Sequence, residues 1–334
     1  MDPIFVNLRC MQRRMTGVQR YTQEITSRLH VEWKGIIPGH TLGHLVGPLW
    51  DQSILALKAR SGLLWSPANT GPIMHPRHIV TIHDLAVLKK EPWFSQTFQR
   101  YYANLVPKLI QNAIHIITVS EFIRAEILSQ FDLREDKVET CPLGVSPKFF
   151  VDSAPNQANP YLLTVGSLDP RKNLPRLFQA WRQVHPRFPE IELRVVGGGG
   201  SIFKSMNSSL IGGCNIRLLG NISDTELLEQ YRGATAFAYP SLYEGFGLPV
   251  LEAMAAGLPL LTSERSAMSE ITGDCAILVD PLEEESISSG LMRLLGTEEL
   301  RHSLSQSGKA IARTFTWERT AESIARILIR HNSR

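Results

Sequence analysis

The chain has 334 residues, 43% hydrophobic and 20% charged, with a formal net charge of +3. At roughly 100–200 residues per domain this length predicts two domains, and the charge balance gives no reason to expect nucleic acid as a partner. The four cysteines show no paired spacing, which excludes a disulfide framework or a structural zinc site as the basis of the fold.

The first part of the chain alternates β-branched runs with amphipathic stretches, which predicts strands that are each followed by a helix. In chain order we expect a strand at 4–8, a helix at 18–32, a strand at 78–84, a helix at 94–112, a strand at 114–120 and a helix at 121–131. Continuous apolar strands joined by helices indicate a parallel sheet that is covered on both faces.

A polar segment with two prolines, 151–160, is typical of a linker, and the alternation restarts after it. Further strands are expected at 161–167, 191–197, 215–220, 235–240, 258–263 and 275–280. Further helices are expected at 174–185, 201–210, 223–232, 248–256, 283–295, 298–313 and 316–331. The predicted fold class is α/β, with two doubly wound domains that face each other across a cleft, and such clefts are favoured ligand sites.

The segment 239–263 carries the most informative motif. Two glutamates, Glu244 and Glu252, stand on either side of the run GFGLPVL. Glu244 is expected on the loop after a buried strand, and Glu252 is expected inside the helix that follows. In an open α/β sheet this is the edge at which ligands bind.

A second candidate is the loop GSLDPRKNL, which begins at Gly166 and places Arg171 and Lys172 before a helix. Two cations at a helix amino terminus favour an anion. The alternative is a surface loop with solvated charges. The glycine run at 197–200 is not a dinucleotide fingerprint, because Ile202 stands at the last glycine position; it indicates a tight turn or a close approach to a ligand.

The first domain offers weaker signals. His83 and Asp84 end a buried strand, where a polar pair is either structural or directed at a ligand. Gly17 opens the first long helix, with Thr16 as its expected cap. The sequence has no Walker A motif, no Asp-x-Asp pair to hold a metal against a diphosphate, and no nucleophile elbow.

The basic run in the first thirty residues comprises Arg9, Arg13, Arg14, Arg20 and Arg28. A solvated face is the ordinary explanation, and an anionic membrane surface or a phosphate-bearing substrate is the alternative. The amino terminus lacks a signal-peptide core, and no run of about 18 apolar residues predicts a transmembrane helix. We therefore expect a cytoplasmic protein, peripheral on the inner face of the cell membrane if the basic run meets lipid.

Taken together, these segments resemble glycosyltransferase family 4, the retaining enzymes of GT-B fold. The resemblance covers nearly the whole chain. It rests on the glutamate pair with GFGLPVL, on RKN at 171–173, on HD at 83–84, and on the segments 118–127, 143–150 and 315–324.

The resemblance implies two Rossmann-like domains: an acceptor-side domain at 1–150 completed by a C-terminal helix at 316–334, and a donor domain at 160–315. It also assigns roles to individual residues. Arg171 and Lys172 would neutralise the donor diphosphate, and Glu252 would bind the ribose hydroxyls. Glu244 would face the transferred sugar. The remaining expected contacts are backbone N–H groups of Phe246, Gly247 and Leu248, the phosphate-loop glycines Gly17 and Gly166, and His83 in the sugar pocket.

Two positions depart from the family pattern. Ser167 stands where many members carry an arginine, and Thr16 precedes Gly17 where many have a double glycine.

The function that we expect from the resemblance is a metal-independent, retaining glycosyl transfer that needs no cofactor. Preorganised cations and helix amino termini would stabilise the departing diphosphate. The donor is a nucleotide sugar, GDP-mannose as the first hypothesis and a UDP-sugar as the other. The acceptor is a glycan or a polyprenyl-diphosphate-linked oligosaccharide in surface polysaccharide or lipopolysaccharide biosynthesis. Two alternatives keep this fold: a phosphorylase or nucleotide-sugar epimerase, and a non-catalytic nucleotide-sugar-binding partner.

Overall fold

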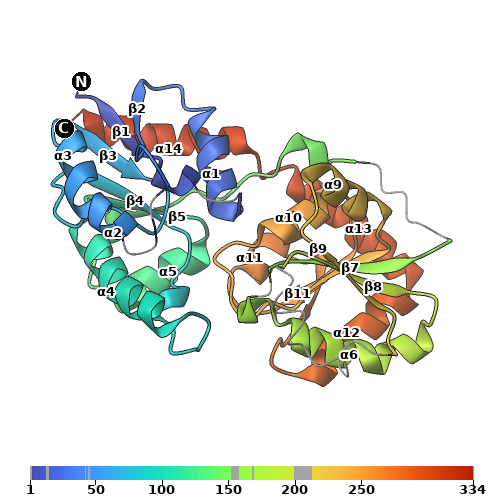
Figure 1. Ribbon diagram of the computed structural model, residues 1–334. Helices are drawn as coiled ribbons and strands as arrows, with labels where there is room; N and C mark the ends of the chain where they lie inside the picture. The colour runs from blue at the N-terminus through green and yellow to red at the C-terminus, as the bar shows by residue number, and fades with distance from the viewer. Residues whose placement is uncertain are drawn as a thin grey trace. The chain divides into compact units, whose positions relative to one another are not determined.

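The computed structural model describes residues 2–12, 15–41, 43, 46–151, 158–167, 169–198 and 213–333. The chain divides into two compact units, one made of Met1–Gly144 with Thr316–Arg334 and the other of Val145–Phe315 (Figure 1). Several sequence expectations lie outside the described residues: the helix at 201–210, the last two glycines of 197–200, most of the linker, Arg13 and Arg14.

The first unit is built on a six-stranded sheet whose registered pairs are all parallel, with the strand order β2-β1-β3-β4-β5-β6. Its strands are β1 (Ile4–Asn7), β2 (Trp33–Ile36), β3 (Leu63–Ser66), β4 (His78–Ile82), β5 (His115–Thr118) and β6 (Val138–Thr140). The strand order reverses between β1 and β3. Loops that leave the carboxyl ends of these two strands therefore diverge to opposite faces and open a crevice.

The helices of this unit are α1 (Gly17–Thr26), α2 (Val46–Trp50), α3 (Ala56–Ala59), α4 (Gln96–Asn112), α5 (Glu121–Gln130) and α14 (Trp317–Asn332). A π-helical segment, η2 (Asp51–Leu55), joins α2 to α3. Short 3₁₀ turns are η1 (Arg9–Gln12), η3 (Ala86–Leu88) and η4 (Glu135–Lys137). The last helix, α14, packs on α1 and β3 (Figure 1), and its Asn332 side chain donates to the Asp2 carbonyl at 2.7 Å.

The second unit has its own six-stranded sheet, again with parallel registered pairs, in the order β12-β11-β10-β7-β8-β9. Its strands are β7 (Tyr161–Val165), β8 (Glu192–Val196), β9 (Ile216–Gly220), β10 (Ala236–Tyr239), β11 (Leu260–Ser263) and β12 (Ala276–Val279). This is the 3-2-1-4-5-6 order of a dinucleotide-binding sheet, and it reverses between β7 and β10.

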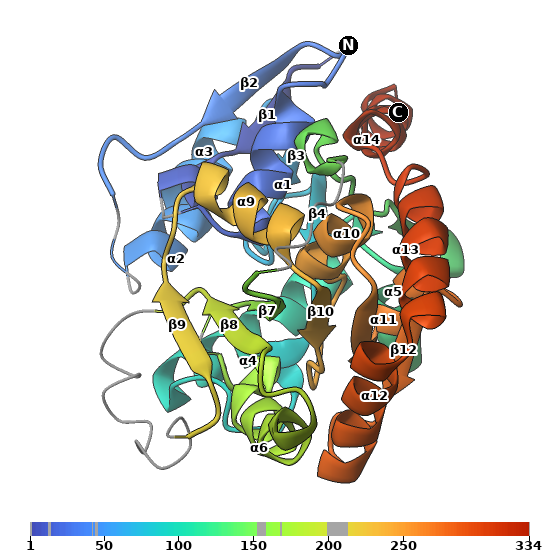
Figure 2. The ribbon, with the colours of Figure 1, turned by 90° about the vertical axis from the view of Figure 1, so that its right-hand side faces the viewer.

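Helices cover both faces of the second sheet, as Figure 2 shows for α6 and α12 on one side and α9, α10 and α13 on the other. They are α6 (Leu174–Val184), α9 (Asp224–Gly233), α10 (Leu248–Ala255), α11 (Met268–Thr272), α12 (Glu284–Gly296) and α13 (Glu298–Ala312). Short 3₁₀ turns are η5 (Pro147–Phe149), η6 (Pro170–Lys172) and η7 (His185–Arg187). The fully buried Trp181 and Phe178 of α6 share one core cluster with Leu291 of α12 and Leu193 of β8.

The expected α/β class with two doubly wound sheets is confirmed, and most expected elements differ from the structure only at their ends. The helix expected at 18–32 is wrong in length, since α1 ends at Thr26. Residues 27–32 turn out of the helix because Trp33 must start an extended strand that pairs with Ile4 of β1. Within the described part of the chain, no helix is long and apolar enough to cross a membrane.

Candidate functional site

The crevice of the second sheet gathers the two strongest sequence motifs. The loop at 166–172 follows β7, and the loop at 241–247 follows β10, the two strands at which the strand order reverses. The loops are tied together, because the Leu242 amide donates to the Arg171 carbonyl at 2.7 Å. The motifs with Lys172 and Glu244 are thus brought to the edge where open α/β sheets bind ligands.

Lys172 and Glu244 form the centre of this site. The Lys172 ammonium donates to Glu244 Oε1 at 2.6 Å and to the Tyr239 hydroxyl at 2.7 Å. The Tyr239 hydroxyl donates to the same Oε1 at 2.9 Å, and the Ser241 hydroxyl lies 2.6 Å from it. Within the described residues, no hydrogen bond to Glu244 Oε2 is made, so this oxygen is the one that a ligand hydroxyl can reach.

The electrostatics of this centre keep Lys172 charged. Burial by itself would lower the pKa of the ammonium, but the Glu244 carboxylate and the Tyr239 hydroxyl outweigh it, so the pKa of Lys172 is raised. Burial, together with the nearby Glu244 charge, raises the pKa of Tyr239, which stays a neutral donor. Lys172 is therefore a fixed cation beside the Glu244 carboxylate.

The amino terminus of α10 adds hydrogen-bond donors. Gly247 is its N-cap, and the backbone there has φ 106°, a left-handed conformation that favours glycine. A Cβ at this position would press on Met268, with Sδ at 3.1 Å and Cε closer still. The first N–H groups of a helix have no intrahelical acceptor, so the turn presents the amides near Phe246, Gly247 and Leu248 to an anion.

Arg171 is placed differently from Lys172. Its guanidinium is held by Asp169, with Nη2 at 2.6 Å from Oδ2 and Nε at 3.1 Å from both carboxylate oxygens. Although burial opposes it, this pairing with Arg171 lowers the pKa of Asp169. Each of the two cations is therefore paired with its own carboxylate, Arg171 with Asp169 and Lys172 with Glu244.

Two other predicted donor-side residues lie beside this centre. Gly166 packs so closely on Lys172 that a Cβ would lie 3.2 Å from Lys172 Cγ, which explains why a small residue stands there. Glu252, on α10, is only 4% exposed, and its Oε2 accepts a hydrogen bond from the Tyr231 hydroxyl at 3.1 Å.

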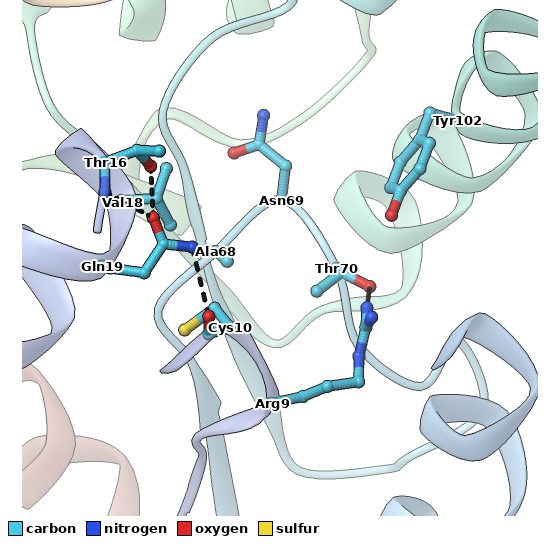
Figure 3. Close-up of a pocket in the computed structure, with 9 residues that line it drawn as sticks. All are labelled: Arg9, Cys10, Thr16, Val18, Gln19, Ala68, Asn69, Thr70 and Tyr102. Carbon is cyan, nitrogen blue, oxygen red and sulfur yellow. Dashed lines mark hydrogen bonds between the residues drawn. The ribbon is translucent and has the colours of Figure 1, made fainter. Parts of the chain in front are cut away.

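The first unit has a polar pocket at its own strand-order reversal. The pocket, of about 170 Å³, is lined by residues after β1 (Arg9 and Cys10), from the start of α1, after β3 (such as Thr70), and by Tyr102 of α4. Figure 3 shows the Tyr102 hydroxyl turned toward Thr70 and Arg9, with Gln19 on the opposite wall.

A buried ion pair forms the floor of this pocket. Arg9 Nε donates to Asp51 Oδ1 at 2.9 Å, Nη2 donates to Oδ2 at 2.6 Å, and Nη2 also reaches the Thr70 hydroxyl at 2.9 Å. Arg9 is 6% exposed and Asp51 is wholly buried. Because the two charges cancel, the pocket offers hydrogen bonds without a net charge, and Arg9 is not part of a solvated basic face.

His83 and Gly17 lie near this pocket. The His83 ring donates through Nε2 to the Pro67 carbonyl at 2.8 Å, and its backbone amide donates to Asn69 of the pocket wall at 2.7 Å. Burial lowers the pKa of His83, so the ring is neutral and Nδ1 is an acceptor. Gly17 is the exposed first residue of α1, where the Thr16 amide donates to Gln19 Oε1 at 3.0 Å, as expected of a capped helix start.

Three contacts of the site were not predicted from the sequence: Tyr239, Ser241 and Asn173. Asn173 adopts a left-handed φ of 58° and donates through Nδ2 to the Pro240 and Pro281 carbonyls at 3.0 and 2.7 Å. The sequence did contain a signal for Tyr239 and Ser241, because both stand at the end of the buried strand that precedes Glu244. Among the described residues, no cluster of three or more His, Cys, Asp or Glu side chains could hold a metal ion.

These features define a class: a two-unit α/β protein with two cation–carboxylate pairs and a helix amino terminus at the reversal point of the second sheet. The chain matches the family described as Glycosyl transferases group 1 over residues 145–311 and the one described as Glycosyltransferase Family 4 over residues 59–149. The chain therefore belongs to the family 4 glycosyltransferases and is a glycosyltransferase, as the resemblance indicated.

Relatives support this assignment. The O-antigen chain mannosyltransferase B of Escherichia coli is 30% identical over 257 residues, which cover 72% of this chain and 67% of that protein. The MMP alpha-(1->4)-mannosyltransferase of Mycolicibacterium hassiacum is 27% identical, over 75% of this chain and 62% of its own length. The names of both describe transferases, which favours this class over a phosphorylase, an epimerase or a non-catalytic partner.

Solved structures agree on the fold. The lipopolysaccharide-biosynthesis glycosyltransferase WaaG superposes with a TM-score of 0.77 at 18% identity and covers 97% of this chain and 99% of its own. Anabaena HepE in complex with UDP-glucose gives a TM-score of 0.77 at 17% identity, over 98% of this chain and 100% of its own. At these identities the likeness establishes the GT-B fold alone.

Proposed function

We propose that the protein is a retaining, metal-independent mannosyltransferase that uses GDP-mannose. The observation that carries the proposal is the Lys172–Glu244 pair at the β7/β10 reversal, beside the amino terminus of α10. The named mannosyltransferase relatives support mannose as the sugar. A UDP-sugar is the second candidate donor, because HepE, which shares the fold, binds UDP-glucose.

The charged groups of the site indicate how it would stabilise the transfer reaction. As the bond between the sugar carbon and the phosphate oxygen breaks, negative charge builds on the departing diphosphate. The Lys172 ammonium and the α10 amides near Gly247 would stabilise it in place of a metal ion. Arg171, which Asp169 engages as Glu244 engages Lys172, would contribute in the same way. In a front-face attack the acceptor hydroxyl forms the new bond to the same carbon and gives its proton to the departing phosphate.

The other predicted residues take binding roles in this proposal. Glu244 Oε2 would accept a hydrogen bond from a hydroxyl of the transferred sugar, and Glu252 would bind the ribose hydroxyls. His83 would accept a hydrogen bond from the sugar through Nδ1. Gly17 would allow the first loop to approach the diphosphate.

We also propose that the pocket over Arg9 and Asp51 receives the acceptor. Its lining is polar but its charges are paired, which fits the hydroxyls of a neutral sugar better than a phosphate or a uronic acid. The acceptor would then be the sugar end of a glycan or lipid-linked oligosaccharide in surface polysaccharide assembly.

The test is a thermal-shift comparison of GDP-mannose, UDP-glucose and the bare nucleotides, all in excess EDTA. At about 100 times the dissociation constant a ligand adds about 2.7 kcal/mol, which raises the melting temperature of a unit this size by roughly 5–10 °C. We expect that shift for GDP-mannose and a much smaller one for Lys172→Met. A shift that requires a divalent metal, or that only UDP-glucose gives, would contradict the proposal.

A further inference from the structure

One surface of the first unit exposes large apolar side chains. Val46, Leu49, Ile54 and Leu57 of the helical run from α2 through η2 to α3 are 53%, 69%, 45% and 60% exposed, and the neighbouring Ile37 is 47% exposed. Four of them, all but Leu57, line one shallow hollow of about 460 Å³. We name this surface the α2–α3 face.

The side chains on the opposite side of the same helical run are buried in the core. Trp50, Leu55 and Ala59 pack on Ile36 and Leu64 of the sheet. Asp51 is held by Arg9, as described above. The run therefore cannot rotate to bury its outer residues.

The π-helical segment explains why these apolar residues share a side. Leu49 and Ile54 are five residues apart, a spacing that points in different directions in a regular α-helix. The i→i+5 pattern of Asp51–Leu55 adds a residue to one turn and brings both side chains outward. Such π turns are often found at functional sites, and here the turn aligns exposed apolar groups.

Among the described residues, the hollow of the α2–α3 face is lined by one cation, Lys58, and by no acidic side chain. Lys34 and Arg60 are exposed close to it in the chain. The only acidic residue between positions 33 and 65 is Asp51, which is buried against Arg9. An apolar stripe bordered by cations is the chemistry that enters an anionic lipid interface.

We propose that the α2–α3 face docks the protein on an anionic bilayer, with Leu49, Ile54 and Leu57 in the interface and Lys58 at the headgroups. The proposal deepens the proposed function, on which it rests for the lipid-linked acceptor. Two residues of the basic run at the amino terminus are engaged within the protein. Arg9 is buried in an ion pair, and Arg28 is paired with Glu24 and Glu318.

The experiment is sedimentation of the full chain with phosphatidylcholine vesicles that either contain or lack phosphatidylglycerol. The test variant is Leu49→Gln/Leu57→Gln, which keeps good helix formers. The matched control is Ile329→Gln, which changes a 43% exposed residue of α14 in the same unit. We expect the wild type and the control to bind the anionic vesicles, the double variant to bind at least about tenfold more weakly, and none to bind neutral vesicles strongly.

Equal binding by the double variant, or no binding of the wild type to anionic vesicles, would overturn the inference. The inference would also be overturned if the wild type sediments as a dimer and the double variant as a monomer, because the face would then join two copies of the chain. The donor-induced thermal shift, measured on the same samples, keeps the two proposals apart. A normal shift without vesicle binding refutes only the docking face, and vesicle binding without a shift refutes only the donor assignment.

Discussion

Replacing Lys172 by methionine separates the structural and catalytic roles of the central ion pair. The Lys172 and Glu244 side chains are 16% and 12% exposed and their charged atoms lie 2.6 Å apart. Removing one partner of a buried pair costs about 3–5 kcal/mol, because the remaining charge is left uncompensated. Tyr239 and Ser241 still donate to Glu244, so we expect about 2–3 kcal/mol of lost stability.

The same change also removes the cation assigned to the departing diphosphate. Loss of one preorganised group of this kind slows the chemical step by about 10²–10³-fold. The double variant Lys172→Met/Glu244→Gln has no unpaired charge, so it regains most of the lost stability. It does not regain transfer, since the cation is still missing.

The assay is a double-mutant cycle on Lys172→Met, Glu244→Gln and the double variant. Stability is measured by urea unfolding and transfer by release of the nucleoside diphosphate under single-turnover conditions. The reasoning is refuted if the double variant recovers transfer along with stability, which would make the pair purely structural. Near wild-type transfer in Lys172→Met would refute it as well.

Three further predictions follow from the structure. Gly247→Ala should cost about 1–3 kcal/mol and slow transfer, because φ 106° is strained for alanine and the new Cβ meets Met268; unchanged urea midpoints and rates would contradict this. Burial lowers the pKa of His78 to about 3 and that of His115 to about 4, so the unfolded chain takes up these protons first as the pH falls. Stability should therefore be lost between about pH 6.5 and pH 5, by about 2 kcal/mol for each of these two histidines, and His78→Gln should remove about 2 kcal/mol of that loss in thermal melts. Tyr102→Ala should raise the KM for a sugar acceptor and leave the donor-induced thermal shift unchanged; a reduced donor shift would argue against an acceptor role for that pocket.

Periodicity predicted the second sheet well. Its strands are continuous apolar runs bounded by turn residues, so each expected strand overlaps an observed one, from Tyr161–Val165 to Ala276–Val279. The first sheet was harder to predict. Trp33–Ile36 is a short edge strand that contains Gly35, and Leu63–Ser66 has only four residues. Neither segment therefore differs enough in hydrophobicity pattern from the neighbouring residues to be recognised as a strand.

The helical run at 46–59 was missed for a related reason. Its apolar residues occupy both sides, Leu55 in the core and Leu49 outside, and a π turn interrupts the 3.6-residue period. Periodicity analysis detects a helix by the contrast between two faces, and this run has little contrast. Which side of this helical run is exposed can be assigned only once Trp50 is known to pack against the sheet.

The sequence motifs indicated where the donor site lies, but not how its charges are arranged. The spacing placed Glu244 and Lys172 at strand ends, and the parallel topology brought them together. The pairing of Arg171 with Asp169 could not be predicted, because it depends on the conformation of a short 3₁₀ turn, Pro170–Lys172, in which Asp169 caps the Arg171 amide. The sequence made Arg171 and Lys172 equivalent, whereas in the structure each has its own carboxylate partner.

The central claim is retention of configuration without a metal at the Lys172–Glu244 site. The most direct measurement is proton NMR of the mannose that is released from GDP-mannose by slow hydrolysis in excess EDTA, recorded before the sugar equilibrates in water. The account predicts that the α-anomer appears first, and that Lys172→Met abolishes the signal. Initial release of the β-anomer, or release only after a divalent metal ion is added, would contradict it.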